Sequence, residues 1–378
     1  MNARTLPRPT KVVLALAFSL AVTACGSDPA GAPASGAAPS SPELGPIPGN
    51  GAPTQAAPHV LTTGLQAPWG LAFLPGGDAL VTERDSARVL RIPAGGGQPT
   101  QITRIAIAAP GGEGGLLGIA VSPTFAQDQL VFVYVTTEQD NRIVRFRLDR
   151  PAELTPVLTG IPRARVHNGG RLAFGPDRLL YAGTGDTGDS SLAQDPRSLG
   201  GKVLRMTSTG EPTEAGGTLV FSLGHRNVQG LAFDRSGQLY ATEFGQNRFD
   251  EVNLLVAGGN YGWPAVEGAG TGGGRFRAPL VTWEPSEASP SGAAVAGGDL
   301  YVAALRGERL WQIQLSRPGQ PGGAVANGTP IPLLAGQYGR LRAAATAPDG
   351  ALWVLTSNRD GRGSPGDTDD RILRLVVP

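Results

Sequence analysis

One arrangement of apolar and polar positions recurs six times along the chain. Each copy has a short apolar run, a tight turn rich in Pro, Gly or Asp, and a second apolar run, as in Gly70-Leu-Ala-Phe-Leu-Pro-Gly-Gly-Asp-Ala-Leu-Val-Thr-Glu. Turn residues of this kind between two apolar runs predict a β-hairpin. The copies begin at positions 70, 118, 171, 230, 292 and 343. This spacing suits one four-stranded sheet per copy and indicates a repeat protein.

Six such sheets predict an all-β fold, a six-bladed β-propeller over residues 59–378. We expect the ring to close by pairing of residues 60–65 with the last strand, from Asp370 to Val377. A tandem of β-sandwiches is the alternative, but it offers no reason for six equivalent hairpins. Small residues suit the crowded strands near a propeller axis, which gives the many glycines of the repeats a structural use.

Composition and charge narrow the classes of function. The chain has 56 Gly and 33 Pro, the two poorest helix formers, so long helical bundles are disfavoured. Its 32 Lys and Arg nearly balance its 31 Asp and Glu, for a net charge of +1. No global basic field attracts nucleic acid or an anionic membrane, so the chemistry must come from local clusters.

The amino-terminal segment predicts export. Basic residues precede a short apolar run, Val12 to Val22, which is too short to span a bilayer. Val22-Thr-Ala-Cys25 follows and resembles a bacterial lipobox. We therefore expect a signal peptide over 1–24, lipidation of Cys25, and a flexible Pro- and Gly-rich tether over 25–58. The protein would be a monomer, held to the outer face of the cell membrane only by its lipid. An ordinary secretory signal with a chance cysteine is the alternative.

The loops between the repeats carry the chemically distinctive residues, as is usual for propellers. Four segments stand out: Val166-His-Asn-Gly-Gly170, Gly224-His-Arg-Asn-Val-Gln229, Asn260-Tyr-Gly-Trp263 and Arg340-Leu-Arg342. His225 is expected to brace its loop rather than to catalyse. The Asp- and Arg-rich stretch over 358–370 is expected to be an exposed loop, with a cation site as the alternative.

These motifs resemble the soluble PQQ-dependent sugar dehydrogenases, a family of six-bladed propellers. The resemblance covers residues 60–378 and is strongest at Gly224-His-Arg-Asn, Asn260-Tyr-Gly-Trp-Pro and Leu199-Gly-Gly-Lys-Val-Leu-Arg. It implies oxidation of an aldose sugar with PQQ and Ca²⁺ as cofactors. It also implies an external electron acceptor that reoxidises the PQQ.

The resemblance assigns roles position by position. His167 matches the general base and Asp186 the carboxylate that orients it. The residues that match cofactor-binding positions are Glu113, Arg226, Asn227, Arg306, Arg340 and Arg342. Gly245 and Gln246 match backbone carbonyls that ligate the Ca²⁺ under PQQ. Glu251 and Tyr261 match a second, structural Ca²⁺ site.

Three positions depart from the family pattern. Glu113 stands where the family often has Gln, Gln246 replaces a frequent Pro, and Arg306 replaces a frequent Lys. A carboxylate at position 113 would face an anionic cofactor unless it is protonated or paired with an arginine. None of the three changes removes a required group.

The residue chemistry agrees with the resemblance. PQQ is a planar quinone with three carboxylates, and arginines bind carboxylates through two parallel hydrogen bonds. Ca²⁺ requires oxygen ligands and would act as a Lewis acid on the quinone. A histidine suits proton removal near neutral pH, and hydride transfer from C1 to PQQ would give a lactone. The alternatives are a non-catalytic propeller that binds a glycan or protein, and a Ca²⁺-dependent lactonase, whose site would centre on Glu, Asp and Asn.

Overall fold

The computed structural model describes residues 57–214, 217–315, 326 and 328–377. The predicted signal peptide, Cys25 and nearly all of the predicted tether lie outside these residues. Among the residues that it describes, no helix is long and apolar enough to cross a membrane.

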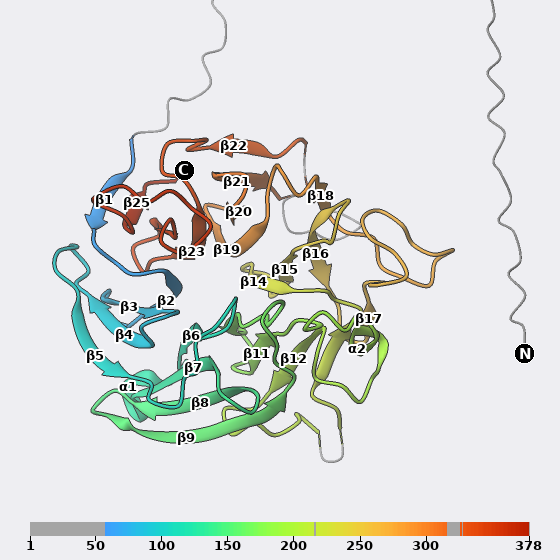
Figure 1. The fold of residues 1–378 in the computed structure, drawn as a ribbon, viewed down its shortest axis with the longest axis horizontal. Coiled ribbons are helices and arrows are strands. Elements are labelled where there is room, and N and C mark those ends of the chain that lie inside the picture. Colours follow the sequence, from blue (N-terminus) through green and yellow to red (C-terminus); the bar gives the residue numbers. More distant parts are fainter. Residues whose placement is uncertain (1–56, 215–216, 316–325, 327, 378) are drawn as a thin grey trace, which may run out of the picture. The chain divides into compact units, whose positions relative to one another are not determined.

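Six β-sheets are arranged around a central channel, which confirms the predicted six-bladed propeller (Figure 1). Blade 1 consists of β2 (Pro68–Phe73), β3 (Ala79–Glu83), β4 (Arg88–Ile92) and β5 (Thr100–Arg104), and blade 2 of β6 (Leu116–Val121), β7 (Leu130–Thr136), β8 (Asn141–Arg147) and β9 (Arg150–Ile161). Blade 3 consists of β10 (Leu172–Phe174), β11 (Leu180–Gly183), β12 (Lys202–Met206) and β13 (Val220–Leu223), with β17 (Gly259–Asn260) added in parallel to β13.

The remaining three blades have four strands each. Blade 4 consists of β14 (Val228–Phe233), β15 (Leu239–Glu243), β16 (Asp250–Leu255) and β18 (Val281–Trp283), and blade 5 of β19 (Pro290–Ala296), β20 (Asp299–Ala304), β21 (Arg309–Gln314) and β22 (Ile331–Leu333). Blade 6 consists of β23 (Leu341–Thr346), β24 (Leu352–Thr356), β25 (Ile372–Leu375) and β1 (His59–Thr62). Two short helices, α1 (Phe125–Asp128) and α2 (Ser191–Gln194), lie in connecting segments. All six predicted hairpins are present as the first two strands of their blades.

The ring closes where the sequence predicted. β1 pairs antiparallel with β25, with His59 opposite Arg374 and Val60 opposite Leu373. Leu65 and Asp370 extend this pairing through two backbone hydrogen bonds of 3.0 and 3.1 Å. The last blade is therefore built from both ends of the propeller, and each blade has a neighbour on both sides.

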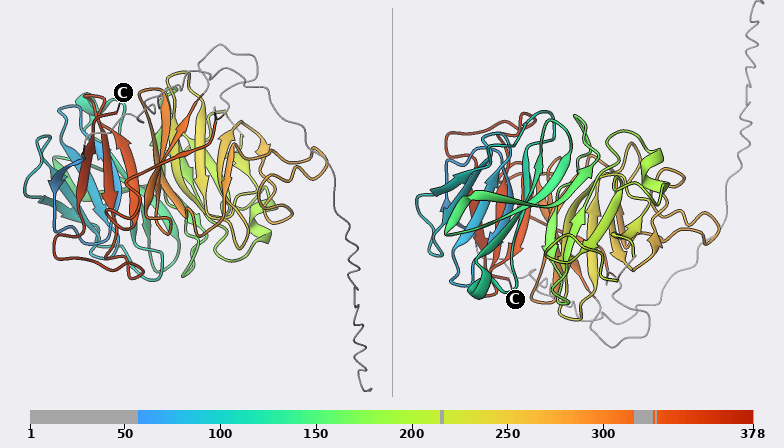
Figure 2. Two further views of the ribbon diagram at one scale, coloured as in Figure 1. Left: turned by 90° about the horizontal axis from the view of Figure 1, so that it is seen from above. Right: turned by 90° about the horizontal axis from the view of Figure 1, so that it is seen from below.

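The hydrophobic core lies between neighbouring blades. Phe73 of blade 1 packs edge-on against Trp353 of blade 6, and Trp283 of blade 4 stacks on Trp311 of blade 5. The first strand of each blade lies next to the channel and contacts the first strands of its neighbours. The turns and loops collect on the two opposite faces of the ring (Figure 2), so residues far apart in sequence meet there.

Close approach of the inner strands requires very small residues. A Cβ added at Gly70 would lie 2.8 Å from the Leu117 carbonyl oxygen, and one at Gly230 would lie 2.3 Å from the Ser291 carbonyl oxygen. Both contacts are shorter than van der Waals separation, so the repeated glycine is needed for the blades to pack around the axis.

Candidate active site

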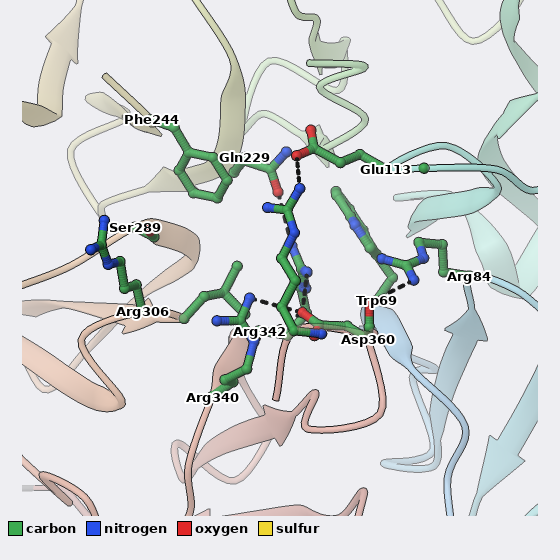
Figure 3. Close-up of a pocket in the computed structure, with 13 residues that line it drawn as sticks. Trp69, Arg84, Glu113, Gln229, Phe244, Ser289, Arg306, Arg340, Arg342 and Asp360 are labelled. Carbon is green, nitrogen blue, oxygen red and sulfur yellow. Dashed lines mark hydrogen bonds and ion pairs between the residues drawn. The ribbon is translucent and has the colours of Figure 1, made fainter. Parts of the chain in front are cut away.

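A cavity of about 400 Å³ opens at one end of the channel. Figure 3 shows its walls, which come from loops and inner strands of five blades. The lining residues are Trp69, Arg84, Gly112, Glu113, Gln229, Phe244, Ser289, Leu305, Arg306, Arg340, Arg342, Asp360 and Arg362. The structure thus brings four of the predicted cofactor-binding residues, Glu113, Arg306, Arg340 and Arg342, to one cavity.

Two of these arginines share one carboxylate. Arg340 Nη2 lies 2.9 Å from Asp360 Oδ2, and Arg342 Nη2 lies 3.3 Å from the same atom. Arg342 Nη1 also donates to Gln229 Oε1 at 3.1 Å, while Arg342 Nε has no hydrogen-bond partner in the part of the chain that the structure describes. Burial would raise the pKa of Asp360, but Arg342 and Arg340 outweigh it and lower the pKa. One carboxylate for two guanidinium groups leaves this wall of the cavity positive.

The expectation of an exposed loop over 358–370 holds for the middle of this stretch, where residues 361, 362 and 364–368 are exposed, but is wrong for its two ends. Asn358, Asp360 and Asp370 are buried. The loop turns back into the channel because Asp360 pairs with the arginines and the Asp370 carboxylate accepts the Asn358 amide. No local sequence pattern distinguishes this loop from a solvated charged one.

His167 and Asp186 form the predicted pair. His167 Nδ1 lies 2.7 Å from Asp186 Oδ1, and the other carboxylate oxygen accepts a 2.9 Å hydrogen bond from Trp263 Nε1. Burial would raise the pKa of Asp186, but hydrogen bonds from His167 and the Gly188 amide outweigh it and lower the pKa. An ionised carboxylate only accepts, so Nδ1 carries the hydrogen and Nε2 is left to take up a proton.

The backbone of His167 is held in an uncommon conformation. Its φ of 51° lies in the left-handed region, and Gly169 follows with a φ of 63°. The Glu113 carboxylate accepts the His167 amide at 2.8 Å, and Asn227 Oδ1 accepts the Gly169 amide at 3.0 Å. These two contacts fix the turn that presents the imidazole.

The Glu113 carboxylate, which would otherwise repel an anionic cofactor, is paired with an arginine. Its Oε1 lies 2.8 Å from Arg362 Nη2, while its Oε2 accepts the His167 amide. Arg362 is the compensating cation, and it belongs to the stretch that was expected to be a solvated loop.

The motif at 224–229 contributes in different ways along its length. Arg226 lies over the Trp263 ring and donates to the Phe244 carbonyl at 3.2 Å, and its buried Nε has no partner among the residues that the structure describes. His225 is fully buried, and its two ring nitrogens contact Glu243 and Ser222. His225 therefore braces the loop, as expected. Asn227 is also fully buried and contacts the His167 turn rather than the wall of the cavity.

The loop after β15 is held by carboxylates. The Gly245 amide donates to Asp250 Oδ1 at 2.9 Å, and the Gln246 amide donates to Glu267 Oε1 at 2.7 Å. The next three backbone amides also donate to Glu267 Oε1. The loop is thereby locked by its N–H groups.

Glu251 lies in an acidic, buried environment. Burial and the neighbouring Glu243 raise its pKa to about 8. Asn253 Nδ2 donates to both carboxylates, and no described residue donates a hydrogen bond to Asn253 Oδ1. The Tyr261 hydroxyl donates to the Leu254 carbonyl at 2.7 Å. In the described part of the chain, no group of three or more His, Cys, Asp or Glu is arranged to hold a metal ion.

A family model described as glucose/sorbosone dehydrogenase matches residues 65–374. The chain belongs to this family. The PQQ-bound aldose sugar dehydrogenase of Streptomyces coelicolor is 49% identical, with a TM-score of 0.79 over 85% of this chain and 97% of that chain. Aldose sugar dehydrogenase YliI of Escherichia coli is 28% identical over 82% of this chain and 92% of its own length. An uncharacterized protein of Synechocystis, slr1608, is 31% identical over 94% of this chain and 98% of its own length.

The glucose/sorbosone dehydrogenase family consists of sugar oxidoreductases, so the cavity and the adjacent His167 and Asp186 constitute the candidate active site of an enzyme. Trp69, Gln229 and Asp360 also line the cavity, and the sequence motifs predicted no role for any of the three. Gln229 ends a motif that had been singled out, and Trp69 directly precedes the first repeat. Those adjacencies were the available signals for Gln229 and Trp69, and for Asp360 the signal was its place in the Asp- and Arg-rich stretch over 358–370.

Proposed function

We propose that this family member oxidises aldose sugars to lactones, with PQQ as the redox cofactor and His167 as the general base. The observation that carries the proposal is the pair formed by His167 and the ionised Asp186, close to a cavity walled by arginines. The similarity to a PQQ-bound aldose sugar dehydrogenase supports the cofactor, and the family supports the substrate class.

The cavity fits a planar tricarboxylate. Arg340 and Arg342 share one carboxylate, and among the described residues the buried Arg342 Nε has no hydrogen-bond partner. Unpaired buried donors are costly, and a ligand that brings several carboxylate oxygens would satisfy them. Arg306, Arg340 and Arg342 would hold the carboxylates. When bound, PQQ supplies a two-electron acceptor for the hydride that leaves C1 of the sugar.

The chain's own residues supply the proton chemistry. His167 Nε2 would accept the proton of the anomeric hydroxyl, and Asp186 would stabilise the imidazolium that forms. Trp263 holds the second oxygen of Asp186, and Glu113 holds the His167 backbone, so the imidazole is oriented before substrate arrives. Loss of this proton and of the C1 hydride converts the sugar into a lactone. An external acceptor would reoxidise the cofactor.

We propose Ca²⁺ as the second cofactor. The carbonyls of Gly245 and Gln246 belong to the loop that Asp250 and Glu267 hold, and hard cations prefer oxygen ligands. The raised pKa of Glu251 and the unpartnered Asn253 Oδ1 fit a cation at that position, with Tyr261 on the adjoining segment.

The location is also a proposal. Cys25 would carry the lipid that anchors the protein to the outer face of the cell membrane, with a monomeric propeller on the tether. Substrate and electron acceptor would then meet the enzyme outside the cytoplasm.

Reconstitution tests the proposal. The purified protein is mixed with PQQ and Ca²⁺ and assayed with an artificial electron-accepting dye across a panel of aldoses. We expect PQQ-dependent dye reduction and a lactone product. A protein that binds PQQ but reduces no dye with any sugar would favour a non-catalytic sugar- or protein-binding propeller, and one that does not bind PQQ would refute the cofactor.

A further inference from the structure

One position of the repeat breaks its own pattern. The first residue of each copy is glycine or alanine in five of six cases, and the third copy has Arg171 instead. The five small residues are Gly70, Gly118, Gly230, Gly292 and Ala343. Each of them stands on an inner strand next to the channel, and Arg171 directly precedes the inner strand β10. The single large side chain at this level therefore enters space that the other five blades leave open.

Arg171 reaches across the channel to other blades. Its guanidinium lies over the Trp69 ring of blade 1 at 4.2 Å, and its Nε donates to the Gln229 carbonyl of blade 4 at 2.8 Å. A Cβ added at Gly292 of blade 5 would lie 3.0 Å from Arg171 Nη2. The side chain thus contacts three blades other than its own, and it is buried.

Arg171 lies between two cavities of the channel. Trp69 and Gln229, two of the residues that Arg171 contacts, line the arginine-walled cavity of the candidate active site. Arg171 itself lines a second cavity of about 420 Å³, whose other walls are mainly small apolar residues of the inner strands. The Arg171 cation is therefore separated from the active-site cavity by the lining residues Trp69 and Gln229.

No carboxylate in the described residues neutralises the charge of Arg171. Its Nη2 has no hydrogen-bond partner, and no ion pair with a carboxylate is formed by this residue in the part of the chain that the structure describes. Burial and the nearby Arg342 lower its pKa to about 9, so it remains charged at neutral pH. A buried charge without a carboxylate partner destabilises the fold. A function in ligand binding would explain why an arginine is present at this position.

We infer that Arg171 is a positioning residue for the anionic cofactor: its guanidinium, which lies over Trp69 and has no carboxylate partner among the described residues, strengthens binding of a tricarboxylate in the active-site cavity. The inference rests on the proposed PQQ cofactor. The field of a buried cation is poorly screened by water, so it acts on a ligand that it does not touch. The bound carboxylates supply the negative charge that the protein lacks at this point.

A purely structural brace would behave differently from a cofactor-directed cation. Replacement of an unpaired buried charge by an apolar side chain of similar length is often neutral or stabilising. Arg171→Met should therefore leave the cofactor-free protein as stable as wild type or more stable, while PQQ affinity falls. A brace that joins blades through Trp69 and Gln229 predicts the opposite, which is loss of stability without the cofactor.

The experiment measures two quantities on the full chain in the presence of Ca²⁺: the thermal unfolding midpoint without PQQ, and the PQQ dissociation constant by calorimetry. The variants are Arg171→Met and Arg171→Lys, with Arg205→Met as the matched control. Arg205 is also in blade 3 and lies over an aromatic ring, Phe221, but it is away from the channel cavities.

We expect Arg171→Met to weaken PQQ binding by roughly tenfold or more, about 1.4 kcal/mol. Its cofactor-free midpoint should not fall. Arg171→Lys should retain affinity closer to wild type because it keeps the charge, and Arg205→Met should bind PQQ as wild type does. Wild-type affinity in Arg171→Met, or failure of that variant to fold, overturns the inference alone. If the wild-type protein does not bind PQQ, the proposed function is overturned together with this inference. That outcome is recognised from the wild-type measurement alone, so it is distinguishable from failure of the Arg171 inference.

Discussion

Glu113 and Arg362 form an ion pair of 2.8 Å between segments that are 249 residues apart in sequence. The pair links the loop before β6 to the loop after β24, and both residues line the active-site cavity. Because Glu113 also accepts the amide of His167, one carboxylate both neutralises a cation of the cavity and holds the turn that presents the His167 imidazole.

The charge and the hydrogen bond of Glu113 can be separated. Glu113→Gln keeps an oxygen that accepts the His167 amide but removes a negative charge from an anion-binding cavity. We expect PQQ to bind more tightly, with a change in unfolding free energy below about 1 kcal/mol because Arg362 is largely exposed. Calorimetry measures the affinity. Glu113→Ala, the comparison variant, should also lower kcat because the turn loses its anchor; equal kcat in both variants would contradict this role.

His167 should control the chemical step. His167→Ala removes the group that accepts the proton, so kcat should fall by roughly 10²–10⁴-fold while PQQ still binds. Steady-state dye reduction at saturating PQQ measures the effect. His59→Ala is the control, since His59 lies on the outer strand β1 and should leave kcat unchanged. Turnover of His167→Ala near the wild-type rate would refute the proposed base.

Arg340 should act mainly on cofactor affinity. Arg340→Ala removes a charged donor to a carboxylate, an interaction of about 1.5–3 kcal/mol, and PQQ affinity should fall by roughly 10–100-fold. The rate at saturating PQQ should change much less, because Arg340 does not contact His167 or Asp186 in the described hydrogen bonds. Titration of the cofactor-free protein with PQQ measures the affinity, and an unchanged dissociation constant would remove Arg340 from the site.

Asp360 should make the stability of the protein fall at acidic pH. Arg342 and Arg340 lower its pKa below the ordinary 3.8, so its ionised form stabilises the fold above that pH. The contribution disappears as pH falls through the lowered pKa. Asp360→Asn should destabilise the cofactor-free protein by about 3–5 kcal/mol at pH 7, because two buried arginines lose their partner. Thermal unfolding should show this difference constant from pH 5 to 7 and smaller below pH ~3.8; a pH-independent difference would contradict it.

Cys25 should decide where the protein is found. Cys25→Ser removes the thiol that would carry the lipid, so we expect the protein to move from the membrane fraction to the soluble exported fraction. Cell fractionation and incorporation of a labelled fatty acid measure the two effects. Ser27→Ala, two residues away, should change neither. Membrane association that persists in Cys25→Ser without label would refute the lipid anchor.

Much of the fold follows from local pattern. The alternation of apolar residues and the Pro, Gly and Asp turns are properties of a few consecutive residues, and six copies of one hairpin leave little choice of architecture. The closing pair of β1 and β25 was predictable because the last blade otherwise lacks a strand. The pairing of His167 with Asp186 came from the family resemblance; in the structure the two residues flank the first hairpin of one blade, which brings their loops together.

The sequence by itself thus determined the propeller, its closure, and the histidine and arginine loops at the channel. Tertiary structure alone decided that Asp360 is buried between Arg340 and Arg342, that Arg362 neutralises Glu113, and that Arg171 crosses the channel. The physical reason is the range of the interactions. Turn chemistry acts over a few residues, whereas burial and the pairing of charges depend on side chains from different blades, which become neighbours only when the ring closes.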